Sequence, residues 1–113
     1  MPIEMEVEEY DRKCNHLVVL DKQERVVGTL RLVSQGENVK MGRLVVRKSH
    51  RKRGLGRWMM DAALKTAAEK GYKKMLIEAQ TYVVSFYENL GFEITSGEYM
   101  DAGIPHKKMR KML

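Results

Sequence analysis

One basic, glycine-containing segment holds the residue types that could bind an anion. It spans residues 47–57 and reads RKSHRKRGLGR, with five cations in residues 47–53. Gly54 and Gly56 stand where the apolar pattern changes from that of a strand to that of a helix. The first turn of a helix presents backbone N–H groups without intrahelical acceptors, and glycine lets an anion approach them closely. We therefore expect a phosphate or polyphosphate site in this segment.

Other functions of such a segment stay open at this point. Neither the spacing of a P-loop, Gly-x-x-x-x-Gly-Lys-Ser/Thr, nor that of a dinucleotide-binding Gly-x-Gly-x-x-Gly turn occurs in the sequence. A basic run can also bind nucleic acid, and it can simply be a solvated loop. Its position after a strand favours a ligand site, because open α/β sheets bind ligands at the carboxyl ends of their strands.

The elements around this segment predict an α/β fold with a mixed sheet. Apolar runs over residues 39–46 and 73–79 predict two strands, and helical spacing over residues 55–70, ended by Gly71, predicts a helix between them. A strand, a helix and a strand in this order form a crossover unit, so the two strands should be parallel. The other expected elements are strands over residues 17–20, 26–33, 92–95 and 107–112 and a short helix over residues 83–90.

Composition and charge are those of a folded domain with an anionic partner. The 113 residues suffice for one domain, and a single cysteine, Cys14, excludes an intrachain disulfide. No apolar run could span a bilayer and no signal segment is seen, so we expect a cytoplasmic protein without a membrane partner. The net charge is +6, with −5 on residues 1–11 and +11 on the rest. Nucleic acid, anionic lipid and a phosphate-bearing cofactor all fit this surplus.

Two motifs in sequence order resemble those of the GNAT N-acetyltransferases. The segment RKRGLG, residues 51–56, matches the Arg/Gln-x-x-Gly-x-Gly/Ala motif for acetyl-CoA, and SFYENLGF, residues 85–92, is similar to the second family signature. Gln80, the segment 101–106 and Met109 are similar to the ElaA-like branch. The resemblance covers residues 6–112. It implies a central splayed, mostly antiparallel sheet, with the thioester held between two parallel strands.

The resemblance implies how acetyl-CoA and an amine acceptor would be bound. Main-chain groups of Leu44, Val45 and Val46 would pair with the pantetheine arm as an added strand would. Gln80 and His106 would line the acceptor pocket, and no metal is expected. The pyrophosphate would be held by the amides and side chains of Arg51, Lys52, Arg53, Gly54, Leu55, Gly56 and Arg57.

Tyr87 and Glu78 are the expected catalytic residues. The resemblance places the Tyr87 phenol near the thioester sulfur, and a phenol with a pKa near ~10 can donate a proton to a thiolate whose conjugate acid has a pKa near ~8.5. The amine must lose a proton, and Glu78 or His106 could accept it; we favour Glu78. A tyrosine on a short helix can also be a packing residue, and Glu78 can also belong to a strand-end ion pair. Cys14 has no assignable base, so we expect direct attack in a ternary complex.

The start of the chain departs from the family pattern. Family domains begin with a strand and one or two helices that form a wall of the acceptor site, whereas here an acidic arm, residues 1–15, precedes the expected domain, residues 16–113. We expect the arm to be a loop, the usual first strand and helices to be lacking, and a homodimer partner to supply the missing wall.

The expected function is acetyl-CoA-dependent transfer of an acetyl group to a primary amine of a small molecule or peptide. A non-catalytic acetyl-CoA-binding module is the alternative. Nucleic-acid binding through the basic segment is the least favoured reading, because the segment lacks interleaved aromatic residues.

Overall fold

The computed structural model describes residues 14–51 and 54–113 in full and residues 4–11 by their backbone. The strands are β1 (Glu4–Asp11), β2 (Cys14–Leu20), β3 (Val26–Gln35), β4 (Asn38–Val46), β5 (Lys74–Gln80), β6 (Glu93–Ile94), β7 (Tyr99–Asp101) and β8 (Ile104–Met112). The helices are α1 (Leu55–Glu69) and α2 (Val84–Glu88), preceded by the 3-10 turns η1 (Lys48–His50) and η2 (Thr81–Val83). Within the described ranges, no helix has the length and hydropathy needed to cross a membrane.

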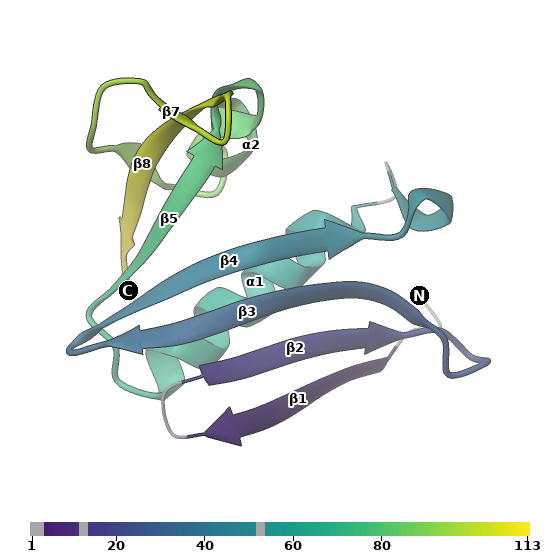
Figure 1. Ribbon diagram of the computed structural model, residues 1–113. Coiled ribbons are helices and arrows are strands. Elements are labelled where there is room, and N and C mark those ends of the chain that lie inside the picture. The colour runs from purple at the N-terminus through teal and green to yellow at the C-terminus, as the bar shows by residue number, and fades with distance from the viewer. Residues whose placement is uncertain (1–3, 12–13, 52–53) are drawn as a thin grey trace.

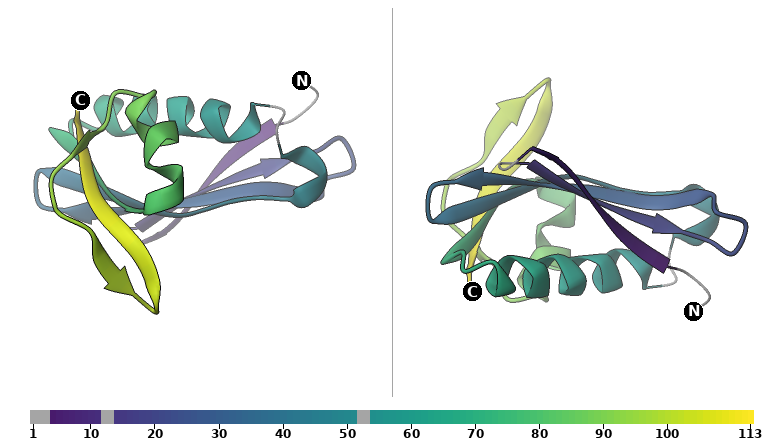
Figure 2. Two further views of the ribbon diagram at one scale, coloured as in Figure 1. Left: turned by 90° about the horizontal axis from the view of Figure 1, so that it is seen from above. Right: turned by 90° about the horizontal axis from the view of Figure 1, so that it is seen from below.

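The described strands form one eight-stranded mixed sheet, and both α-helices lie on the same face of it (Figures 1 and 2). The strand order is β1-β2-β3-β4-β5-β8-β6, and β7 pairs with β8. The expected α/β fold with a mostly antiparallel sheet is confirmed. The predicted short helix over residues 83–90 is divided between η2 and α2, and β7 was not predicted.

The acidic segment contains a strand and is not the loop that we expected. Residues Glu4–Asp11 pair antiparallel with β2, with Val7 opposite Leu17. β2 itself begins at Cys14, so the expected boundary between residues 15 and 16 falls inside a strand. Because Glu and Asp are depleted in strands, the charge of the segment pointed to a loop. The apolar residues at alternate positions, Met5 and Val7, were the signal for a strand.

β4 and β5 are the only parallel neighbours in the described sheet, and they separate soon after they begin. Their pairing joins Asn38 to Lys74 and ends with Lys40 opposite Leu76. β5 then runs beside β8, while β4 stays beside β3 (Figure 1). The edge of β4 beyond Lys40 therefore faces an opening and not a neighbouring strand. Both the crossover through α1 and the splayed sheet are confirmed.

A β-bulge in β4 reverses the alternation of its side chains where this opening begins. Between two successive pairs, β3 contributes one residue and β4 contributes two, Arg43 and Leu44, and Arg43 has a φ of 54°. Before the bulge Val39 and Met41 are buried in the core; after it Leu44 and Val46 pack against the core. The extra residue thus keeps apolar side chains facing the opening and leaves Arg43 exposed.

Helix α1 packs its apolar side directly on the sheet. Its buried residues follow helical spacing and are Leu55, Met59, Met60, Ala63 and Ala67. The fit is close at Gly28 on β3, where an added Cβ would lie 2.7 Å from the Met59 sulfur. Burial of this side of α1 fixes where its first turn lies relative to β4.

Replacing Met59 by alanine should lower the free energy of unfolding by about 2–5 kcal/mol, because the side chain is fully buried and its removal leaves a cavity. Urea unfolding measures the change. The matched control is Met112→Ala on β8, where 63% of the side chain's surface is exposed and the change should stay within about 0.5 kcal/mol. Equal losses in the two variants would contradict this packing.

Candidate active site

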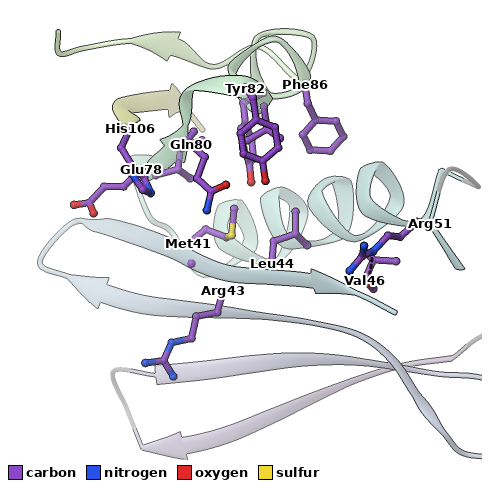
Figure 3. A pocket seen from close by; sticks show the side chains of 15 residues that line it. Met41, Arg43, Leu44, Val46, Arg51, Glu78, Gln80, Tyr82, Phe86 and His106 are labelled. Atoms are coloured by element: carbon purple, nitrogen blue, oxygen red, sulfur yellow. Dashed lines mark hydrogen bonds between the residues drawn. The ribbon is translucent and has the colours of Figure 1, made fainter. Parts of the chain in front are cut away.

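A cavity of about 440 Å³ fills the opening between β4 and β5. Its walls come from the bulged part of β4 on one side and from β5, η2 and α2 on the other (Figure 3). His106, at the near end of β8, and Arg51, after η1, complete the lining. The cavity therefore exists because the parallel pair ends early.

The cavity brings together seven of the predicted site residues, which are Leu44, Val46, Arg51, Glu78, Gln80, Tyr87 and His106. Val45 is 56% exposed and does not line the cavity, because neighbouring residues of a strand point to opposite sides. The predicted residues from Gly54 to Arg57 lie at the start of α1. Lys52 and Arg53 lie outside the described residues.

The first turn of α1 leaves its backbone donors available to a ligand. Gly54 is the N-cap, with a φ of 76° that favours glycine, and no side chain caps the helix. No acidic residue lies in the first turn, so none there offsets the partial positive charge of the helix end. The N–H groups of Leu55, Gly56 and Arg57 have no acceptor within the helix. An uncapped helix end of this kind is able to bind an anion.

The start of α1 lies close to two residues that line the cavity. The Arg51 Nε donates a hydrogen bond to the Val46 carbonyl oxygen at 2.9 Å, which holds this guanidinium at the end of β4 (Figure 3). A Cβ added at Gly56 would meet the Phe86 ring at an ordinary 3.8 Å, and Phe86 lines the cavity. Packing therefore does not require glycine at this position.

The Tyr87 side chain is held in one orientation by two other rings. Phe86 and Phe92 contact it edge to face, with centroid separations of 5.1 and 5.8 Å. Only 8% of its surface is exposed, and burial raises the pKa of its phenol above the ordinary value of 10.0. Its hydroxyl makes no hydrogen bond to the described residues. At neutral pH it is thus a protonated donor in the cavity wall.

Glu78 and His106 provide two proton acceptors on neighbouring strands. Glu78 forms an ion pair with Lys40 of β4, at 3.1 Å between Oε1 and Nζ. His106 lies 2.8 Å through Nδ1 from the Ile104 carbonyl oxygen. Because a carbonyl only accepts, Nδ1 carries the proton there, and in the neutral ring Nε2 keeps its lone pair. Gln80 lies opposite His106 in the β5–β8 pairing.

Sequence reasoning missed part of the lining. Tyr82, which is 79% exposed, points from η2 toward the opening (Figure 3). Met41 and Arg43 of β4 also belong to the lining, although the Arg43 guanidinium points away from the opening. The position of Tyr82 two residues after the end of β5 was the available signal, since residues at the carboxyl ends of such strands often contact ligands. Among the described residues, no group of three or more His, Cys, Asp and Glu side chains is placed to hold a metal ion.

Comparisons with known proteins identify the family of this chain. The family model described as "Acetyltransferase (GNAT) domain" matches residues 3–113. The uncharacterized N-acetyltransferase YjcF of Bacillus subtilis (strain 168) is 39% identical over 112 residues, which cover 98% of this chain and 79% of YjcF.

Solved structures share the fold. Escherichia coli ElaA matches with a TM-score of 0.80 and 22% identity, over 91% of this chain and 74% of ElaA. A GNAT family acetyltransferase from Elizabethkingia anophelis with acetyl-CoA bound matches with a TM-score of 0.83 and 14% identity, over 99% of both chains. These two likenesses show the fold, whereas the family model and YjcF show the family. The chain belongs to the GNAT family of acetyltransferases.

Proposed function

We propose that this acetyltransferase moves the acetyl group of acetyl-CoA to a primary amine of a small molecule or peptide by direct attack. One observation carries the proposal: the cavity beside the free edge of β4 is lined by Tyr87 and also by Arg51 and Phe86, which lie next to the first turn of α1. The helix end, the β4 edge and the cavity thus offer, one after another, groups that could bind a diphosphate, an amide-bearing arm and a thioester.

The residues present fit the acetyl donor. The amides of Leu55, Gly56 and Arg57, together with the Arg51 guanidinium, would bind the pyrophosphate. Leu44, Val45 and Val46 lie on the part of β4 that has no pairing with β5, so their main chain could pair with the pantetheine amides. When bound, acetyl-CoA supplies an activated acyl group.

Tyr87 would stabilise the leaving group. As the amine nitrogen bonds to the acyl carbon, the carbon–sulfur bond breaks and the sulfur takes the electron pair. The Tyr87 hydroxyl, protonated and without another partner among the described residues, would donate its proton to that sulfur. Its fixed ring orientation keeps this donor in place before the reaction.

Glu78 would accept the proton that the amine gives up. Glu78 lines the cavity on β5, and the Lys40 ammonium beside its carboxylate can compensate for its charge. Gln80 and His106 would orient the acceptor, since both side chains border the same cavity. The sulfur of Cys14 lies 3.8 Å from His16 Nε2 on β2, and neither residue lines the cavity. This separation supports direct attack over an acyl-cysteine route.

The central test is Tyr87→Phe, assayed by release of free thiol from acetyl-CoA with a panel of primary amines. The variant should lose about 10²- to 10⁴-fold in kcat, because it lacks the proton donor, while calorimetry shows unchanged affinity for CoA. Tyr72→Phe is the matched control, since Tyr72 packs against the core and does not line the cavity. Full kcat in Tyr87→Phe would overturn this role for Tyr87.

The titration of Tyr87 gives an independent check. The phenolate absorbance lost in Tyr87→Phe relative to the natural chain should have its titration midpoint above pH 10.0 in the folded protein. The fold favours the protonated phenol, so the stability that it contributes is complete below pH 10.0 and declines as pH rises through the higher folded pKa. A Tyr87 that ionises at or below pH 10.0 would contradict its burial.

A further inference from the structure

A second cavity, of about 210 Å³, lies beside the first. It shares Ile77 and Glu78 of β5 with the larger cavity, so Glu78 borders both. Lys40 on β4 and Lys108 on β8 line it from either side of Glu78. Thr95 and Gln35 add uncharged polar groups.

The charged side chains of this cavity lie on the sheet face opposite the helices. Glu78 and Lys108 are directly opposite each other in the antiparallel β5–β8 pairing, so their side chains share a face. Their neighbours Ile77 and Met109 are buried in the core, on the side covered by the helices. Within the described part of the chain, no helix covers the Glu78 and Lys108 side (Figure 2).

The lining has one positive charge more than it has negative charges. Lys40 and Glu78 compensate each other in their ion pair. Lys108 forms no ion pair with a carboxylate of the described residues; its Nζ lies 5.9 Å from the centre of the Tyr99 ring. The nearby Arg110 already pairs with Glu93 at 2.7 Å. The Lys108 ammonium is therefore the charge in this cavity that is left for a ligand.

We propose that the smaller cavity receives the far end of the acceptor and that Lys108 selects amines that also carry a carboxylate, such as free amino acids and ω-amino acids. This inference rests on the proposed acetyl transfer. The amine would lie at Glu78, where the two cavities meet, and the carboxylate would bind Lys108 on the next strand. Side chains directly opposite in an antiparallel pair start about 4.5–5.5 Å apart at Cβ, so a small molecule can reach both. A diamine would place its second ammonium beside the uncompensated charge of Lys108, so diamines should be poorer acceptors.

The test compares acceptors that differ only at the far end. We would measure kcat/KM by thiol release for ω-amino acids, n-alkylamines and α,ω-diamines of equal chain length. The natural chain should prefer the best ω-amino acid over its alkylamine by about ten- to a hundredfold, the effect of one charge-assisted hydrogen bond. Lys108→Gln should lose most of this preference, and Lys108→Arg should retain it. Lys65→Gln, which removes an 80% exposed charge from α1, should leave it unchanged.

The measurements distinguish a failure of the role proposed for Lys108 from a failure of the proposed acetyl transfer. Equal kcat/KM for the ω-amino acids and the alkylamines, or a preference that survives Lys108→Gln, overturns the role of Lys108 and leaves acetyl transfer standing. No thiol release with any amine overturns the proposed function. Calorimetry on the protein loaded with CoA then still decides the inference: tighter binding of the ω-amino acids, weakened by Lys108→Gln, supports it, and equal binding overturns it.

Discussion

The early end of the parallel pairing between β4 and β5 is the constraint on which the site depends. Three residue pairs join the two strands, and each then follows a different antiparallel partner. A longer ladder would close the opening and satisfy the edge of β4 with backbone hydrogen bonds. The bulge at Arg43 works with the separation, because it turns Leu44 and Val46 toward the space that β5 leaves. Sheet geometry thus produces both the cavity and its apolar wall.

Helix α1 connects, through its packing, the cationic end of the cavity at Arg51 with Tyr87. Its apolar side is buried on the sheet, which places its uncapped first turn beside Arg51 and the end of β4. The same packing leaves Gly56 next to Phe86, whose ring supports Tyr87. An anion held at the helix end would therefore determine how far a molecule reaches toward the phenol. The distance between the helix end and the Tyr87 phenol is therefore set by core packing.

Much of the fold and of the candidate site could be predicted from the sequence, because the patterns that indicate them are local. The spacing of apolar residues predicts α1 within one residue, and Gly54 and Gly56 mark the turn from strand to helix. The strand formed by Glu4–Asp11 was missed because its stability comes from pairing with β2 and not from its charged residues. The ion pair between Lys40 and Glu78, and the unpaired Lys108 beside it, depend on register across three strands, which no local pattern contains.

The most direct test of the whole account is an NMR titration of the natural chain with acetyl-CoA. The account predicts that the amide resonances of Leu55, Gly56 and Arg57 and those of Leu44, Val45 and Val46 move together, with one dissociation constant, because one molecule contacts both segments. Unmoved resonances at the start of α1, or shifts there without shifts on β4, would contradict the claim that the divergence of β4 and β5 forms the donor site.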